Sequence, residues 1–427
     1  MAEAKKIHFI GISGVGMSAL AQLMADEGAR VTGSDNAWFP TLLAVERRGI
    51  PVVIGYAEKN IPEDTELVVH TDAAHPDNVE RMEAVRRGIP QLSYFEMLGK
   101  VSAGKKTVAV AGTHGKTTTT GMLAKILIDA GASPTAIIGS IVKDFGSNYV
   151  AGDSDLFVVE ACEYKDHLLE LSPEILVITN LEWDHTDYFP SLEALQETFK
   201  KAIAKVPAHG TIVTDTKNPN IAPLLSLAQA RIVDYTAEPA YELRLPGEFN
   251  AMNARAAAAA ARIALPTISD AAIAASLADF HGTWRRFEYK GTSAQGADVY
   301  DDYAHHPTAI RETLKALRAK TSGKVFVAFH PHLYSRTRDL LDEFATAFVD
   351  ADTVFIAPIY AAREVDDGSI SSAILAERIR ATGVEAAALS SFDAIEHALA
   401  AAGPGDAIMT MGAGDIYKVA DTLVARS

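Results

Sequence analysis

Short, nearly uninterrupted apolar runs constrain the fold of this chain more than any other feature of its sequence. In the middle of the chain they occupy 108–111, 156–160 and 175–179, and helix-like segments separate them. A strand that is apolar on both faces must be covered on both faces, which is typical of parallel sheets with helices on either side. The pattern therefore predicts an α/β protein built on mostly parallel sheets.

The same alternation of apolar runs and helix-like segments occurs near both ends of the chain. Such runs lie at 7–10 and 67–70, and again at 325–329, 353–357 and 407–411. With 427 residues, the chain is too long for one compact core, since domains average roughly 150 residues. A Gly-Lys-Lys segment at 104–106 and a turn region at 282–284 separate the three sets of runs. We therefore predict three α/β domains, which cover 1–103, 104–283 and 284–427.

Arg-Arg-Gly-Ile-Pro occurs twice in the first predicted domain, at 47–51 and 86–90. Basic residues favour the carboxyl end of a helix, and Gly49 and Gly88 can adopt the left-handed conformation that ends one. The prolines that follow prevent the helix from continuing. Both segments therefore predict helix ends.

Composition excludes several classes of protein. The formal net charge of −16 argues against a protein that coats nucleic acid, because such binding depends on a basic surface. No apolar run is long enough to span a bilayer, and the first residues lack the pattern of a signal peptide. Cys162 is the only cysteine, so no intramolecular disulfide can form. These features predict a cytoplasmic protein, and they predict nothing about its oligomeric state.

Between the run at 108–111 and a helix-like segment lies a glycine-containing loop, Gly112-Thr113-His114-Gly115-Lys116-Thr117-Thr118. Backbone N–H groups at such a strand-to-helix turn bind phosphate, a lysine reaches the outer phosphates, and a hydroxyl binds Mg²⁺. Lys116 and Thr117 fit the last two roles. In the commonest form of this loop a glycine stands five positions before Gly115, where this chain has Val110. The loop therefore predicts ATP binding in a variant form, and the alternative is a glycine-rich turn without a ligand.

Acidic and histidine side chains follow the next two apolar runs of the second predicted domain. Glu160 ends one run, and Asp184, His185 and Asp187 follow the other. Parallel strands bind ligands at their carboxyl ends, so we expect these side chains to complete a metal shell beside the phosphate loop. The alternative is that each is an exposed turn residue. Cys162 has no evident partner base and is interpreted as a small residue at the end of a strand.

A second glycine turn follows the first apolar run. It comprises Gly11-Ile12-Ser13-Gly14-Val15-Gly16-Met17-Ser18-Ala19, it opens a helix-like segment, and Asp35 ends the next predicted strand. This spacing is similar to a dinucleotide fingerprint, in which a helix amino terminus binds a diphosphate and the acidic residue binds a ribose hydroxyl. The turn predicts a diphosphate ligand without distinguishing NAD from a UDP-sugar. A close packing turn without a ligand is the alternative.

Taken together, these motifs resemble the Mur ligase family along essentially the whole chain. The matching segments are 112–118, 179–180 with 184–185, 247–253, 285–288, 301–307, 330–338 and 412–415. The resemblance implies a Rossmann-like domain for a UDP-sugar, a central P-loop ATPase domain and a Rossmann-like carboxyl-terminal domain. It also implies an ATP- and Mg²⁺-dependent ligase of peptidoglycan precursor synthesis, which joins L-alanine to UDP-N-acetylmuramate through an acyl phosphate.

The resemblance implies roles for individual residues as well. The catalytic residues would be Lys116, Glu160 and His185, and the metal ligands would be Thr117, Glu160 and His185. ATP would bind Gly112, Thr113, His114, Gly115, Lys116, Thr117, Thr118, Asn250, Asn253, Arg285 and Asp302. The UDP-sugar would bind Gly14, Val15, Gly16, Met17, Ser18 and Asp35. The amino acid would bind Tyr303, His305, His332 and Arg336.

The residues assigned to the amino acid have competing interpretations. One is a zinc site formed by His305, His306, His330 and His332, although no cysteine accompanies them. For Arg336 the competing interpretation is a solvated basic turn at the start of a helix. A small amino acid offers few contacts beyond its carboxylate, which an arginine can bind through two hydrogen bonds.

Several residues depart from the family's pattern. Many relatives have Glu-Ala-Asp-Glu-Ser-Asp where this chain has residues 160–165, Glu-Ala-Cys-Glu-Tyr-Lys, so the metal role transfers to Glu160 and the part played by Glu163 is open. Relatives often have glycine and arginine where this chain has Ala304 and Leu333. Alanine at 304 also occurs in a sister ligase that attaches a recycled tripeptide to the same UDP-sugar. That activity is the first alternative.

Two further alternatives come from other classes of protein. In a NAD-dependent oxidoreductase, the turn at 11–19 would bind NAD, but the loop around Lys116 would have no role. A nucleotide-binding regulator of similar architecture would bind ATP without ligase activity.

Overall fold

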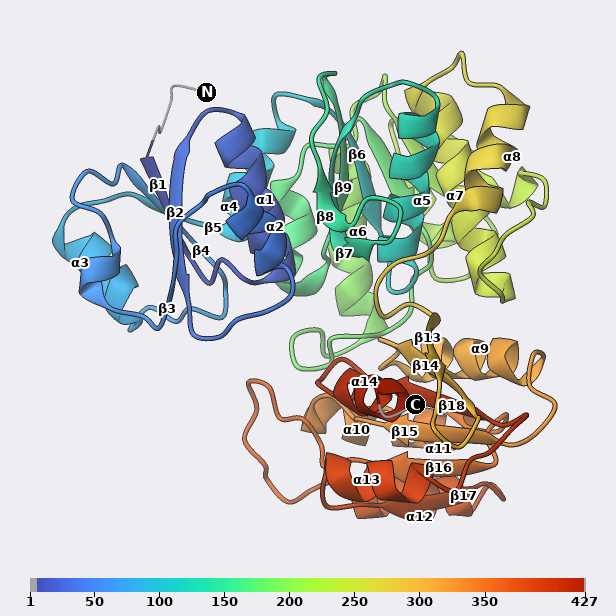
Figure 1. The fold of residues 1–427 in the computed structure, drawn as a ribbon. Helices are drawn as coiled ribbons and strands as arrows, with labels where there is room; N and C mark the ends of the chain where they lie inside the picture. The colour runs from blue at the N-terminus through green and yellow to red at the C-terminus, as the bar shows by residue number, and fades with distance from the viewer. Residues whose placement is uncertain (1–5, 426–427) are drawn as a thin grey trace. The chain divides into compact units, whose positions relative to one another are not determined.

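The computed structural model describes residues 6–425, and it contains three β-sheets (Figure 1). The chain divides into two compact units. The first unit comprises Met1–Leu181, Gln196–Glu242 and Asn253–His281, and the second comprises Glu182–Leu195, Leu243–Met252 and Gly282–Ser427. Two sheets belong to the first unit and one to the second. No helix among the described residues is long and apolar enough to cross a membrane.

The first sheet is parallel throughout and has the strand order β3-β2-β1-β4-β5. Its strands are β1 (Lys6–Ile10), β2 (Arg30–Asp35), β3 (Val52–Ile54), β4 (Leu67–His70) and β5 (Gln91–Ser93). The helices between and after them are α1 (Val15–Asp26), α2 (Leu42–Arg47), α3 (Val79–Arg86) and α4 (Tyr94–Ser102). The predicted helix ends are confirmed, because α2 and α3 stop just before Gly49 and Gly88, whose φ angles are +71° and +67°.

The second sheet has the order β12-β11-β10-β6-β9-β7-β8, and only its edge pair β7–β8 is antiparallel. Its strands are β6 (Lys106–Ala111), β7 (Thr135–Val142), β8 (Ser147–Val150), β9 (Leu156–Glu160), β10 (Ile175–Ile178), β11 (Thr211–Thr214) and β12 (Arg231–Asp234). Helices α5 (Lys116–Asp129) and α8 (Asp270–Asp279) belong to the same unit, whereas α6 (Leu192–Lys205) and α7 (Glu248–Ala264) begin in the second unit and end in the first. The central strand β6 is fully buried at 108–111, as its apolar run predicts.

Within the first unit, the two sheets are joined through α1. This helix packs against β7 and β8, and Asn148 of β8 donates from Nδ2 to the carbonyl oxygen of Val15 at 2.5 Å and to Ser18 Oγ at 3.2 Å. On α4, a Cβ atom at Gly99 would come within 2.6 Å of the carbonyl oxygen of Glu170, so the two parts approach closely there too. The first two predicted domains therefore form one compact unit, and the boundary near 103 stays a prediction.

The third sheet has the order β13-β14-β18-β15-β16-β17, and only β13 is antiparallel to its neighbour. Its strands are β13 (Glu288–Thr292), β14 (Asp298–Asp302), β15 (Val325–Phe329), β16 (Thr353–Ile356), β17 (Glu385–Ala388) and β18 (Ala407–Met411). Its helices are α9 (Pro307–Arg318), α10 (Tyr334–Asp339), α11 (Leu341–Ala347), α12 (Ser372–Arg380), α13 (Phe392–Leu399) and α14 (Tyr417–Ala425).

Side chains of β15 alternate between two buried clusters on opposite faces of this sheet. Val327 and Phe329 join a cluster with α9, α11 and α12, whereas Phe326 and Ala328 join one with α13 and α14. The sheet is therefore covered on both faces, and the predicted α/β fold with three mostly parallel sheets is confirmed. The segments at 182–195 and 243–252, which the sequence assigns to the central domain, cluster with this sheet. The boundary near 283 stays a prediction.

Candidate active site

The phosphate loop lies between β6 and α5, and the strand beside β6 holds it in shape. Thr179 donates from Oγ1 to the carbonyl oxygen of His114 at 2.6 Å, and Asn180 donates to the same oxygen at 3.0 Å. The side-chain oxygen of Asn180 accepts the N–H of His114 at 2.8 Å, and its carbonyl oxygen accepts the N–H of Thr113. Asn180 therefore fixes the loop from both sides, a role that its place in the sequence did not reveal. The loop ends at the amino terminus of α5, where helical N–H groups favour an anion.

Two glycines of this loop lie where no side chain fits. Gly112 has a φ of +127°, and a Cβ atom there would come within 2.2 Å of Thr179 Oγ1. Gly115 caps α5 with a φ of +80°, and a Cβ atom there would come within 2.1 Å of Asn253 Oδ1. The glycine spacing of this variant loop thus follows from how closely β10 and α7 approach it.

Lys116 begins α5 and turns back over the loop. Its Nζ lies 3.0 Å from Glu163 Oε1 and donates to the carbonyl oxygen of Gly112 at 2.5 Å. The Glu163 side chain is only 1 % exposed. Burial opposes the charge on Lys116, but the Glu163 carboxylate outweighs it and raises the lysine pKa above its usual value. Lys116 is therefore held as a cation beside the phosphate loop. Its partner is Glu163, whose role the sequence left open.

Thr117 of this loop and Glu160 at the end of β9 provide two neighbouring side-chain oxygens that could bind a metal ion. The Thr117 hydroxyl donates to Glu160 Oε1 at 3.1 Å, and the N–H of Gly139 on β7 donates to Glu160 Oε2 at 2.8 Å. A Cβ atom at Gly139 would come within 2.2 Å of that same oxygen. Hydroxyl and carboxylate oxygens are ligands that Mg²⁺ prefers, so the donor set fits the predicted ion. His185 belongs to the second unit, and its role as the third ligand stays a prediction.

The amino-terminal glycine turn forms the start of α1, with Gly14 as the N-cap. Asp35 at the end of β2 holds this turn: its Oδ2 accepts the N–H of Ser13 at 2.9 Å, and its Oδ1 accepts the N–H of Asn36 at 2.7 Å. The Thr41 hydroxyl donates to the carbonyl oxygen of Ser13 at 2.5 Å. Asp35 is thus a structural clamp for the turn, and its contact with a ribose stays a prediction.

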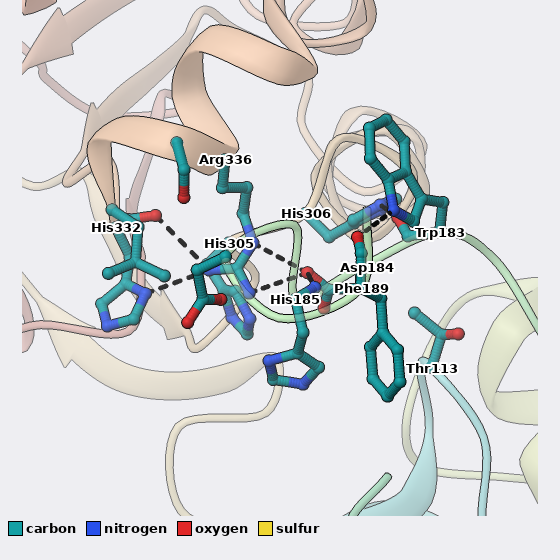
Figure 2. Close-up of polar contacts among 12 residues, drawn as sticks. Thr113, Trp183, Asp184, His185, Phe189, His305, His306, His332 and Arg336 are labelled. Atoms are coloured by element: carbon teal, nitrogen blue, oxygen red, sulfur yellow. Dashed lines mark hydrogen bonds and ion pairs between the residues drawn. The ribbon is translucent and has the colours of Figure 1, made fainter. Parts of the chain in front are cut away.

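In the second unit, Arg336 at the first turns of α10 lies between an acidic residue and a histidine (Figure 2). Its Nε and Nη2 lie 2.8 and 2.7 Å from Asp184 Oδ1, and its Nη1 donates to His332 Nδ1 at 3.0 Å. Burial opposes ionisation of Asp184, but the Arg336 charge outweighs it and holds the carboxyl pKa well below its usual range. Asp187 pairs with Arg363 of the same unit. Asp184 and Asp187 therefore serve as partners of arginines.

The other residues predicted to bind the amino acid lie around Arg336. The rings of Tyr303 and His305 are 5.3 Å apart, and those of His305 and His332 are 6.0 Å apart. His305 donates from Nδ1 to the carbonyl oxygen of Tyr303 at 2.9 Å. Burial lowers the pKa of His332 to about 3, and burial with the Arg336 charge lowers that of His305 well below its usual value. The structure thus brings the four predicted residues together, and Arg336 supplies their positive charge.

Arg285 and Asp302, which the sequence assigns to ATP, are both buried and bonded within the second unit. Arg285 Nε lies 2.8 Å from Asp301 Oδ2, and its Nη1 and Nη2 donate to the carbonyl oxygens of Gly414 and Gly412 at 2.9 and 2.6 Å. Asp302 accepts the N–H groups of two residues, and burial raises its pKa to about 6. These bonds fix the start of the 285–303 segment.

The two asparagines that the sequence assigns to adenine lie three residues apart on α7. Asn250 donates to the carbonyl oxygen of Pro246 at 2.7 Å, and Asn253 Oδ1 accepts from Thr119 at 3.3 Å. The contacts of these residues and of Arg285 and Asp302 with ATP stay predictions.

Comparison with known proteins decides the family. Three family models match consecutive stretches: "Mur ligase family, catalytic domain" at 6–106, "Mur ligase middle domain" at 110–242, and "Mur ligase, glutamate ligase domain" at 285–414. The UDP-N-acetylmuramate–L-alanine ligase of Clostridium acetobutylicum is 36% identical over 99% of this chain and 98% of its own length. That of Acetivibrio thermocellus is 40% identical over 98% of this chain and 95% of its own length. The chain belongs to the Mur ligase family.

Solved structures of other Mur ligases share the whole fold of this one. The UDP-N-acetylmuramate-alanine ligase of Thermotoga maritima has a TM-score of 0.82 and 27% identity, and it covers 99% of this chain and 98% of its own. A murein peptide ligase of Psychrobacter arcticus has a TM-score of 0.74 and 26% identity, with the same coverage. The predicted family and architecture are therefore confirmed.

In this Mur ligase, the residues that depart from the family's motifs have structural roles. Leu333 is buried, has a φ of +73°, and donates its N–H to the carbonyl oxygen of Tyr360 at 2.9 Å. Ala304 donates its N–H to Asp302 Oδ1 at 2.7 Å. Burial raises the pKa of the Cys162 thiol to about 12, so this thiol stays protonated and unreactive near neutral pH.

Proposed function

We propose that this Mur ligase joins L-alanine to the lactyl carboxylate of UDP-N-acetylmuramate and hydrolyses ATP to ADP and phosphate in doing so. The observation that carries the proposal is that one compact unit contains both a diphosphate-type glycine turn at 14–18 and a phosphate loop with Lys116. An oxidoreductase would need only the first of these features. Full-length relatives named for the alanine-adding reaction support the substrate assignment. The reaction belongs to peptidoglycan precursor synthesis in the cytoplasm.

The reaction has two chemical steps. A carboxylate oxygen of the UDP-sugar attacks the γ-phosphorus of ATP, the bond to the β-phosphate oxygen breaks, and ADP leaves. The nitrogen of L-alanine then attacks the acyl carbon, the bond from this carbon to the phosphate oxygen breaks, and the amine loses a proton. The result is an amide and inorganic phosphate. Each step redistributes negative charge, so positioning and charge neutralisation provide most of the rate enhancement.

The residues of the first unit fit the first step. Lys116 is already charged and lies over the loop, where it neutralises the transferring phosphoryl group. Thr117 and Glu160 would hold Mg²⁺, which neutralises phosphate charge when bound. By resemblance, His185 would complete this set. When nucleotide enters, we expect Lys116 to exchange its bonds to Glu163 and Gly112 for phosphate oxygens.

The residues of the second unit fit the binding of the amino acid whose nitrogen attacks in the second step. Arg336 is the cation among these side chains, because His305 and His332 are neutral near pH 7. A guanidinium with hydrogen bonds to Asp184 and His332 is fixed in orientation, and its remaining N–H groups can bind the substrate carboxylate. A single oriented cation favours an amino acid that has a single carboxylate.

The test is substrate-dependent phosphate release. We expect release to require both UDP-N-acetylmuramate and L-alanine, with little release when either is omitted. Equal release with L-alanyl-γ-D-glutamyl-meso-diaminopimelate in place of L-alanine would favour the tripeptide-adding alternative. Purified protein that retains NAD and fails to bind the UDP-sugar would favour the oxidoreductase.

A further inference from the structure

Tyr94 lies against the amino-terminal glycine turn. It is the first residue of α4, where Ser93 and Glu96 form a capping box with bonds of 3.2 and 2.7 Å. A Cβ atom on Gly16 would come within 2.5 Å of Tyr94 Cζ and within 2.7 Å of its hydroxyl oxygen. The phenol therefore rests on Gly16, in the first turn of α1, where unpaired helical N–H groups favour an anion. Gly16 leaves the space that the Tyr94 ring occupies.

The Tyr94 hydroxyl is available as a hydrogen-bond donor. Burial raises the pKa of Tyr94 far above its usual value, and the charge of Glu160 raises it further. The hydroxyl therefore keeps its proton near neutral pH. Among the residues that the structure describes, none forms a hydrogen bond with this hydroxyl, although the side chain is half-buried. A protonated donor without a protein acceptor therefore lies against the glycine turn.

The segment that carries Tyr94 is held firmly. The Phe95 ring stacks on His167 with ring centroids 3.6 Å apart, and His167 Nε2 lies 2.8 Å from Asp72 Oδ2. The Tyr94 and Phe95 rings meet edge to face at 4.8 Å. Together with the capping box, these contacts fix the direction of the phenol before any ligand binds.

We propose that Tyr94 is a substrate-binding residue whose hydroxyl donates a hydrogen bond to the sugar-side phosphate of UDP-N-acetylmuramate. The inference rests on the proposed function. The α1 amino terminus binds the diphosphate from one side, and Tyr94 at the start of α4 binds it from the other. The Tyr94 hydroxyl adds a hydrogen-bond donor to the diphosphate site without adding a charge.

The test is Tyr94→Phe, which keeps the ring against Gly16 and removes only the hydroxyl. A hydrogen bond to a charged group contributes about 1.5–3 kcal/mol, so we expect the Kd of UDP-N-acetylmuramate and of UDP to rise roughly 10- to 100-fold. UMP lacks the sugar-side phosphate, so its Kd should not change. The KM values for ATP and L-alanine should also stay unchanged. The matched control is Tyr241→Phe in the same unit, whose hydroxyl donates to Glu238 at 2.7 Å.

Calorimetric titration without ATP measures these Kd values, and the unfolding midpoint of each variant verifies folding. Wild-type Kd values for UDP in Tyr94→Phe would overturn the inference, and so would an equal loss of affinity for UMP. Tighter binding by the variant would mean that the ring obstructs the turn, which also overturns it. If instead the wild-type protein releases no phosphate with UDP-N-acetylmuramate and L-alanine both present, the proposed function fails, whatever the variant does.

Discussion

Replacing Asp184 with asparagine should remove the counter-charge of a buried arginine. The side chains of Asp184 and Arg336 are only 5 % and 2 % exposed, and their two contacts are 2.8 and 2.7 Å long. Breaking one side of such a buried pair costs about 3–5 kcal/mol, because the other charge stays buried without its partner. For a unit of roughly 150–250 residues, 1 kcal/mol shifts the unfolding midpoint by about 2–4 °C, so we expect a loss of roughly 10 °C.

Tryptophan fluorescence during urea or thermal unfolding measures this loss. Of the three tryptophans, Trp183 and Trp284 belong to the second unit, and Trp183 Nε1 donates to the carbonyl oxygen of Phe189 at 2.8 Å. Adding Arg336→Met to Asp184→Asn removes the stranded charge and should restore much of the stability.

The control for Asp184→Asn is Asp342→Asn, which breaks an exposed ion pair with Arg378 in the same unit. Exposed pairs contribute about 0–1 kcal/mol, so this variant should unfold nearly like the wild type. The reasoning would be refuted if Asp184→Asn lost no more stability than Asp342→Asn, or if Arg336→Met in the double variant gave no recovery.

Three further substitutions test other parts of the account. Gly139→Ala should push Glu160 away from Thr117 and raise the Mg²⁺ concentration needed for half-maximal phosphate release roughly 10- to 100-fold, whereas Gly104→Ala, with nothing within 4 Å, should not. Lys116→Ala should abolish the ATP turnover that depends on the UDP-sugar, and its unfolding midpoint without nucleotide should show that it still folds. Normal turnover would contradict the role assigned to the loop. Asp302→Asn should remove a pH dependence of stability. Because burial raises the folded pKa of Asp302 to about 6 from 3.8, its contribution is full below about pH 4 and is lost as pH rises through 6. The wild type should lose about 3 kcal/mol relative to the variant between pH 3 and 7, and parallel stability curves would disprove this.

The sequence predicts the sheets and the glycine turns because each depends on local pattern. The run at 108–111 is apolar on both faces and becomes the fully buried centre of a sheet, and the loop at 112–118 lies between this strand and a helix, as its glycines require. The antiparallel β7–β8 edge was not predicted. Its strands include polar residues such as Asn148, which contacts α1, so apolar and polar residues do not alternate simply along them.

The partners of the site residues are harder to predict, because folding alone brings them together. Lys116 and Glu163 are 47 positions apart, and Asp184 and Arg336 are 152 apart, so no sequence period connects them. The sequence therefore predicted Lys116 and Arg336 as binding residues without revealing that each is paired with a buried carboxylate. Their ligands must compete with these carboxylates or add to them.

Transfer of ¹⁸O from the substrate carboxylate to phosphate tests the central claim most directly. UDP-N-acetylmuramate with ¹⁸O in both lactyl carboxylate oxygens is incubated with ATP, Mg²⁺ and L-alanine, and the released phosphate is analysed by mass spectrometry. If an acyl phosphate forms, the amine displaces the phosphate together with one carboxylate oxygen, so each phosphate should contain one ¹⁸O. Phosphate without ¹⁸O, or labelled phosphate released without formation of the alanyl amide, would contradict the proposed reaction.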